Sequence, residues 1–211
     1  RHKHVLVRRY FNDVRPNVCV VWTQVKDSHQ SIMNIALVGN GNMAHVLGRN
    51  FLENGHTILS VHSRNQDLGN ELAHNLSSTW KGLQDDFRPE TEFIILCISD
   101  DYISEVSSKI KSNTSNAIVA HTSGSVPITA IDLKHDKKGV FYPLQTIRKD
   151  SFLLFKETPI CINSDQKETI SRLQTLAESI SKKIYILSDD ERKKAHLSAV
   201  VINNFTNHLV S

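Results

Sequence analysis

The sequence predicts an α/β fold with a doubly wound, mostly parallel sheet of the Rossmann type, and three observations support this prediction. Short β-rich runs alternate with stretches of helical periodicity across residues 33–187. The run at 93–98 is uninterruptedly apolar, as a strand covered on both faces must be. A glycine-rich segment at 39–44 joins the first run to the first helical stretch. We therefore expect one domain at 33–187, followed at 188–211 by the start of a truncated all-α domain.

The first half of the domain contains three predicted strands and three predicted helices. The first strand is a compact apolar run, and the helix after it is expected to end where Gly55 caps it. The segment through Trp80 and Pro89 is interpreted as a loop. The strands are expected at 35–38, 57–62 and 93–98, and the helices at 42–54, 66–76 and 101–110.

The second half continues the alternation and ends in a helix. A helix between the last two strands is predicted from an apolar stripe that includes Leu173 and Leu176. The final helix, 191–211, has apolar residues at helical spacing, and no Gly or Pro ends it. We interpret it as the first helix of an incomplete helical domain. The strands are expected at 117–120, 139–142, 159–162 and 183–187.

Charge is distributed unevenly along the chain. Residues 1–31 contain six of the 25 Lys and Arg residues but two of the 22 Asp and Glu residues, which leaves 19 bases and 20 acids elsewhere. We therefore treat residues 1–32 as a basic N-terminal extension, and we expect no nucleic-acid partner for the nearly neutral remainder.

The apolar runs and the cysteines bear on location. No apolar run approaches the roughly 20 residues that span a bilayer, so we expect no membrane partner. The three cysteines are widely spaced and form no C-x-x-C pair, which predicts neither a disulfide framework nor a metal site. A reducing, cytoplasmic location is expected.

Residues 39–44 match the pattern G-x-G-x-x-G/A in the context that it requires, directly after a strand and at the start of a helix. The first Gly permits a tight turn, and the second lets the backbone approach a pyrophosphate. The final Ala allows close packing of helix on strand, while free N–H groups and the helix dipole bind the diphosphate. The predicted residues are Gly39, Asn40, Gly41, Asn42, Met43 and Ala44.

The end of the second strand predicts which cofactor binds. An acid there would bind the ribose 2′-OH of NAD, but this sequence has Ser63 and Arg64 instead. A hydroxyl beside a guanidinium suits the 2′-phosphate of NADP, because Arg can hold a phosphate with paired charge-assisted bonds. The alternative is that Arg64 is a solvated loop charge.

Residues at the carboxyl ends of the next two strands are also expected to border the cofactor. One of them, His121, is a candidate proton donor near the nicotinamide and, equally, a candidate structural residue. Asp100 is alternatively a helix N-cap. The predicted cofactor-binding residues here are Ile98, Ser99, Asp100, His121, Thr122, Ser123 and Gly124.

The final helix carries a polar stripe made of His196, Val200, Asn203 and Asn207 at helical spacing. If it faces the cofactor, it could orient a carbonyl or imine substrate. The candidate catalytic residues of the whole chain are His121, His196 and Asn204.

Several of these segments resemble bacterial Rossmann-like oxidoreductases that have a C-terminal helical domain of unknown function. This family is related to pyrroline-5-carboxylate reductase and the deazaflavin-linked NADP reductases. The resemblance implies an NADP-binding domain followed by a helical domain for substrate binding and homodimerisation. Related enzymes use a Lys on the corresponding helix, where this chain has His196. The resemblance rests on residues 39–44, 63–64, 98–101, 121–125, 139–146 and 204–208.

Together these observations predict an NADP-dependent oxidoreductase that transfers a hydride between the nicotinamide and a small-molecule C=O or C=N substrate. The alternative is an NADP-binding sensor or scaffold without turnover, since no Lys or Tyr stands out as catalytic. Fold-level analogy does not supply the substrate.

Overall fold

A computed structural model describes residues 20–21, 31–110, 114, 116–145 and 155–210, with only the backbone of 20–21 and 202–210. Most of the predicted N-terminal extension lies outside this range. The described strands form one sheet in the order β1-β9-β8-β7-β6-β5-β2-β3-β4. They are β1 (Val20–Val21), β2 (Asn34–Val38), β3 (Thr57–His62), β4 (Thr79–Lys81), β5 (Phe93–Leu96), β6 (Ile118–His121), β7 (Lys138–Pro143), β8 (Ile160–Asn163) and β9 (Ile184–Ile186).

The sheet is mostly parallel, which confirms the predicted fold class. Strands β2 to β7 pair in parallel throughout, whereas β8 runs antiparallel to β7, and β1 runs antiparallel to β9. The chain passes from β2 to β3 on one side and later returns to β5 on the other side of β2. The carboxyl ends of β2 and β5 therefore flank the point where the strand order reverses, the usual ligand site of such sheets.

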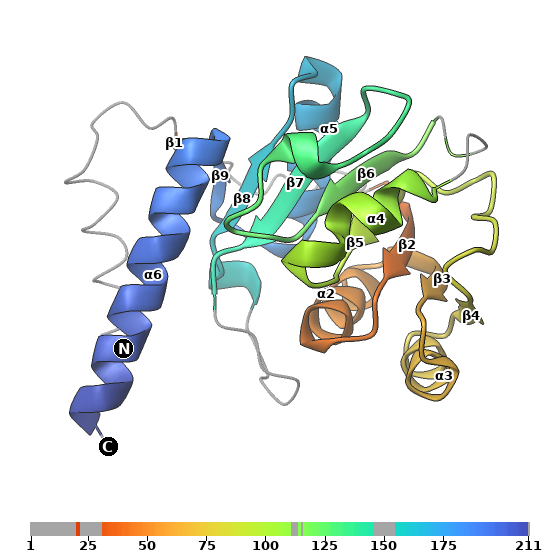
Figure 1. Cartoon of the computed structure of the whole chain (residues 1–211), viewed down its shortest axis with the longest axis horizontal. Coiled ribbons are helices and arrows are strands. Elements are labelled where there is room, and N and C mark those ends of the chain that lie inside the picture. The colour runs from red at the N-terminus through yellow and green to blue at the C-terminus, as the bar shows by residue number, and fades with distance from the viewer. Residues whose placement is uncertain (1–19, 22–30, 111–113, 115, 146–154, 211) are drawn as a thin grey trace.

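Helices cover both faces of this sheet (Figure 1). Alternate residues of β2 show the division, because Ile35 and Leu37 pack with α2, α3 and α5 while Ala36 and Val38 pack with α4. The helices are α2 (Asn42–Glu53), α3 (Gln66–Asn75), α4 (Ile103–Ser108), α5 (Lys167–Ile180) and α6 (Asp189–Val210), with short 3-10 turns at η1 (Asp100–Tyr102), η3 (Ile128–Ala130) and η4 (Phe155–Glu157).

Two short strands were not expected from the sequence. The segment through Trp80 was interpreted as a loop, but β4 pairs there with the end of β3. The segment 1–32 was treated as an extension, but β1 pairs there with β9. Strand β1 has two residues, and two of the three residues of β4 are polar, so neither shows the apolar pattern that predicted the equally short β9.

Helix α6 begins at a capping box and packs against the sheet near β7. The Ser188 backbone N–H and hydroxyl donate to a carboxylate oxygen of Glu191, and the Glu191 backbone N–H donates to the Ser188 hydroxyl. Ala195 packs in a cluster with Val140 and Tyr142 of β7. Among the described residues, no helix combines the length and apolar character needed to cross a bilayer.

Candidate functional site

The glycine-rich loop between β2 and α2 depends on a glycine at its first position. Gly39 has φ +112°, and a Cβ atom there would lie 2.2 Å from the backbone oxygen of Cys97, which follows β5. Only glycine combines this backbone conformation with so close an approach. The loop is thus held against the carboxyl end of β5.

The second glycine of the loop faces open space. A Cβ atom on Gly41 would meet no described atom within 4 Å, and Gly41 is the N-cap of α2, where it offers no side-chain hydrogen bond. The Nδ2 atom of Asn40 is buried and has no partner among the described residues. Asn42 and Met43 form the first turn of α2, and Ala44 is fully buried. Free N–H donors, an orphaned amide and open space fit a bound diphosphate.

A cavity of about 650 Å³ opens beside this loop. Its wall runs over the carboxyl ends of β2, β3 and β5 and includes part of α4. It brings together seven of the predicted cofactor residues: Gly39, Asn40, Gly41, Ser63, Arg64, Ile98 and Ser99. The other predicted cofactor residues, 42–44, 100 and 121–124, do not line it.

The cavity also contains Tyr102 and Lys109, which were not predicted from the sequence. The Arg64 guanidinium lies over the ring of Tyr102, 4.7 Å from its centroid. Lys109 is paired with Glu105 at 2.5 Å, and both line the cavity. Tyr102 could have been found from its place just after β5, but no sequence signal marked Lys109.

The Ser63 hydroxyl does not play the part that the sequence suggested. It donates a hydrogen bond to the Asn65 carbonyl at 2.9 Å and accepts one from the Trp80 indole N–H at 3.1 Å. To bind a phosphate, the Ser63 hydroxyl would have to donate the proton that it already donates to the Asn65 carbonyl. Arg64 is therefore the better supported half of the predicted 2′-phosphate contact.

His121, at the end of β6, is fully buried. Its Nδ1 accepts a hydrogen bond from the Ser123 backbone N–H at 3.2 Å. Its Nε2 makes no hydrogen bond of ordinary geometry with the described residues. Burial lowers the pKa of His121 to about 4, and the nearby Arg192 guanidinium acts in the same direction. A neutral, enclosed imidazole favours the structural role over that of a proton donor.

The loop after β6 is closed by its own side chains. The Ser123 hydroxyl accepts hydrogen bonds from the backbone N–H groups of Ser125 and Val126, and the Ser125 hydroxyl donates to Asp100 at 2.7 Å. The Thr122 hydroxyl donates to the carbonyl of Leu96. Asp100 thus joins the carboxyl ends of β5 and β6, and the N-cap of η1 is Ser99.

Two side chains from distant parts of the chain meet above this loop. The Tyr142 hydroxyl of β7 and Nδ1 of His196 in α6 are 2.7 Å apart, and their rings meet edge to face. A Cβ atom on Gly124 would lie 2.5 Å from Nδ1 of His196 and 2.7 Å from Cζ of Tyr142. Tyr142 was missed because its sequence context resembles that of any core strand. The side chains of Asn203, Asn204 and Asn207 lie outside the described residues.

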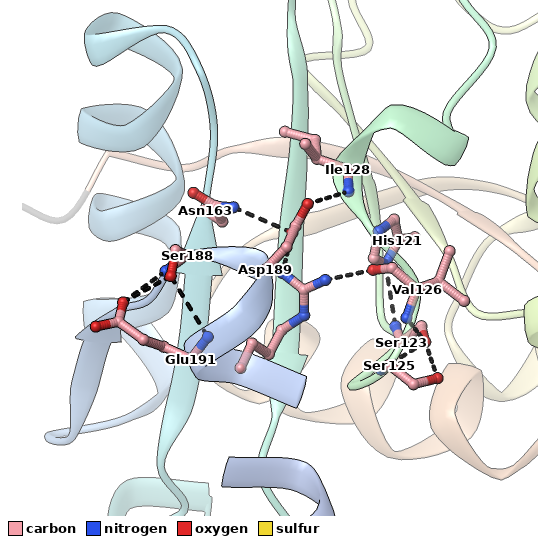
Figure 2. Close-up of polar contacts among 10 residues, drawn as sticks. His121, Ser123, Ser125, Val126, Ile128, Asn163, Ser188, Asp189 and Glu191 are labelled. Atoms are coloured by element: carbon pink, nitrogen blue, oxygen red, sulfur yellow. Dashed lines mark hydrogen bonds and ion pairs between the residues drawn. The ribbon is translucent and has the colours of Figure 1, made fainter. Parts of the chain in front are cut away.

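The first turn of α6 is fastened to the same region (Figure 2). Asp189 accepts hydrogen bonds from the Ile128 backbone N–H at 3.0 Å and from Asn163 at 3.2 Å, and it pairs with Arg192 at 2.7 Å. Arg192, which is 1% exposed, also donates to the Val126 carbonyl. Burial works to raise the pKa of Asp189, but these hydrogen bonds outweigh it, so its pKa lies below the ordinary value.

Comparisons with known proteins agree with this geometry. Residues 34–123 match the family described as "NADP oxidoreductase coenzyme F420-dependent", and residues 158–211 match a domain of unknown function, DUF2520. No curated protein is significantly similar in sequence. The second match begins before β8, so its boundary falls within the sheet rather than at α6.

Solved structures share this fold, and the first of them also supports the family. A candidate NADP oxidoreductase from Bacteroides fragilis is 30% identical, with a TM-score of 0.77 over 84% of this chain and 69% of its own. A protein from Thermotoga maritima is 19% identical, with a TM-score of 0.68 over 83% of this chain and 65% of its own. A 1-pyrroline-5-carboxylate reductase from Streptococcus pyogenes is 15% identical, with a TM-score of 0.56 over 75% of this chain and 60% of its own.

Proposed function

The chain belongs to the family of NADP oxidoreductases that combine a Rossmann domain with DUF2520, and from this we propose that it transfers a hydride between the nicotinamide of NADP and a small C=O or C=N substrate. The observation that carries the proposal is the open space at Gly41, at the start of α2, beside a cavity that contains Arg64. The cavity wall includes Gly41 itself, so this open space belongs to the cavity that contains Arg64.

In the proposed complex, the N–H groups at the start of α2 and the Asn40 amide bind the diphosphate. Arg64, supported by Tyr102, binds the 2′-phosphate. The bound dihydronicotinamide supplies the hydride. By the usual arrangement of such sheets, the reacting end lies over the carboxyl ends of β5, β6 and β7.

The proton required at the substrate oxygen or nitrogen is assigned to His196. Its ring is half-buried, whereas His121 is fully enclosed, so His196 is the candidate that a substrate can reach. Gly124 packs against this ring, which sets the predicted cofactor-binding loop beside it. Asn204 remains a proposed orienting residue of the same helix.

The alternative is an NADP-binding sensor without turnover, and it is favoured by the position of His196 where related enzymes use a Lys. Oxidation of NADPH, followed at 340 nm with ketoacids and cyclic imines, separates the two. We expect saturable turnover with at least one class. Tight NADPH binding with no turnover across the panel would support the sensor.

The preference for NADP is tested by Arg64→Gln. We expect NADP affinity to fall at least about tenfold, roughly 1.4 kcal/mol, while NAD affinity stays unchanged, because only NADP carries the 2′-phosphate. Isothermal titration calorimetry measures both. Arg88→Gln, which removes an exposed guanidinium outside the cavity, is the control. Equal loss of both affinities in Arg64→Gln would contradict the assignment.

We also propose a cytoplasmic homodimer formed through the helical domain. Leu197, Val200 and Val201 are exposed on α6 and are apolar groups that such an interface would cover. Sedimentation equilibrium gives the outcome: a monomer at all concentrations would overturn the dimer for this chain.

A further inference from the structure

The hydrogen bond between Tyr142 and His196 lies at the reacting end of the sheet. In the parallel pairing of β6 with β7, His121 lies opposite Val140, so Tyr142 extends two residues farther toward the carboxyl edge. Tyr142 therefore reaches the region that the proposed function assigns to the substrate. The present inference rests on that proposed function. His196 approaches the same point from α6.

The contact occupies one of the two ring nitrogens. The Tyr142 hydroxyl lies 2.7 Å from Nδ1 of His196, and within the described residues Nε2 of that ring makes no hydrogen bond. Burial raises the pKa of Tyr142, which keeps the phenol protonated and makes it a donor to the neutral imidazole. A phenol oxygen also accepts hydrogen bonds, so the contact persists when the ring becomes protonated.

Other contacts leave the pair little freedom to separate. The Gly124 backbone lies against both rings, so closely that a Cβ atom there would overlap them. One turn before His196, the Asp189–Arg192 ion pair fastens α6 to Val126 and Ile128 of the loop after β6. The position of the imidazole is thus set from both the strand and the helix.

We infer that Tyr142 is a positioning residue, which holds Nδ1 of His196 and leaves Nε2 as the atom that exchanges a proton with the substrate. During reduction, the substrate carbon gains the hydride from the reduced cofactor, and its oxygen or nitrogen takes the Nε2 proton of the protonated ring. The transfer leaves His196 in its minor neutral tautomer, with the remaining proton on Nδ1 and directed at the Tyr142 oxygen, until Nε2 takes up a proton from the solvent. Oxidation follows the same path in reverse.

The hydrogen bond itself is tested first by nitrogen-15 NMR of histidine-labelled chain, with the His196 signals assigned from His196→Gln. In the neutral ring we expect one dominant tautomer, with the proton on Nε2. Tyr142→Phe keeps the ring and removes the hydroxyl, so the Nδ1 signal should move toward that of free histidine. Tyr185→Phe, which removes a phenol hydroxyl two strands away on β9, should leave the signals unchanged. Identical His196 signals in the chain and in Tyr142→Phe would overturn the inference.

A double-mutant cycle then separates positioning from general structural support. Since general acid catalysis contributes about 100-fold or more, His196→Gln should lower kcat at least that much. Tyr142→Phe should lower kcat about tenfold, with the KM for the substrate and the Kd for NADPH changed less than twofold. In the His196→Gln background, Tyr142→Phe should have no further effect. An additive effect would overturn the inference. If no substrate is turned over, the proposed function fails, whereas the NMR result still decides whether Tyr142 orders His196.

Discussion

The two ends of the sheet's carboxyl edge are built in different ways. At the cavity end, the loop 39–41 and the pair 63–64 are short segments shaped mainly by backbone conformation. At the α6 end, the contacts join residues 25 to 66 positions apart, from Ser125 with Asp100 to Arg192 with Val126. The proposed cofactor site can be formed by a local backbone conformation, because the same cofactor binds to many enzymes. A site for the reacting groups is assembled here from strands, a loop and a helix.

The largest effect is expected at the α6 end from Asp189→Asn. It leaves the guanidinium of Arg192 buried without a counter-charge, which costs about 3 kcal/mol of unfolding free energy. Urea denaturation at pH 7 measures this loss. The neighbouring Asp190, which is exposed, gives the control Asp190→Asn, for which we expect less than about 0.5 kcal/mol.

The same variant has a defined pH dependence. Since the pKa of Asp189 is lower in the folded chain than its ordinary value of 3.8, its stabilising effect is fully present above that value. It is lost as the pH falls through the folded pKa. The difference in unfolding free energy between the unsubstituted chain and Asp189→Asn should therefore become smaller in acid. A larger difference there would show that the charge of Asp189 does not stabilise the folded chain.

The cavity end gives an effect of about the same size, in a matched pair of glycine variants. Gly39→Ala adds a Cβ at positive φ and 2.2 Å from a backbone oxygen, which should cost about 3 kcal/mol. Gly41→Ala meets nothing within 4 Å at φ −83°, so stability should change by less than about 0.5 kcal/mol. Its methyl occupies the space proposed for the diphosphate, so NADP affinity should fall at least about tenfold. Urea denaturation and calorimetry measure the two quantities, and unchanged NADP affinity in Gly41→Ala would remove the support for this site.

These two ends also differ in what the sequence could predict. The fold class and the glycine loop were predicted because most strands carry a local apolar pattern, and because the positions of Gly39 and Gly41 follow from turn geometry and close approach. Strand β3 has its predicted bounds, and Gly55 follows α2 with φ +84°, as a helix-capping glycine does.

The α6 end could not be predicted in the same way. Nothing near Tyr142 in the sequence indicates that His196 lies beside it, because the fold and the start of α6 bring them together. The Ser63 hydroxyl illustrates the same limit at the cavity end, since its partner Trp80 is on a strand too short to predict. The local pattern of apolar residues and glycines predicts the backbone conformation. Hydrogen bonds between side chains that are distant in sequence depend on how the elements pack.

A smaller effect concerns histidines at both ends. Burial lowers the pKa of His121 and that of His62, beside the cavity, each to about 4. Between pH 6.5 and 4, the unfolded chain binds protons that the folded chain does not, so stability falls as the pH is lowered through this window. At pH 5.5 the loss relative to pH 7.5 is about 1.4 kcal/mol for each residue.

Removing one of these groups tests that effect. His121→Asn keeps an oxygen that can accept a hydrogen bond from the Ser123 N–H. Between pH 7.5 and 5.5, its unfolding free energy should fall by about 1 kcal/mol less than that of the unsubstituted chain. Guanidinium unfolding at the two pH values measures the difference. His74→Asn, at the exposed end of α3, is the control. An equal pH response in His121→Asn and the chain would mean that His121 is not held neutral.

The smallest effect is expected for Ser63→Ala and bears on how the cavity recognises NADP. Because the Ser63 hydroxyl already donates to Asn65, its removal should change NADP affinity less than about twofold, roughly 0.4 kcal/mol, while Arg64→Gln loses tenfold or more. Stability should still fall by about 1 kcal/mol, since the Trp80 N–H loses its acceptor. Calorimetry and urea denaturation on the same samples separate the two effects. A loss of NADP affinity as large as that of Arg64→Gln would mean that the hydroxyl turns to the phosphate when NADP binds, and that this end of the sheet is not preformed.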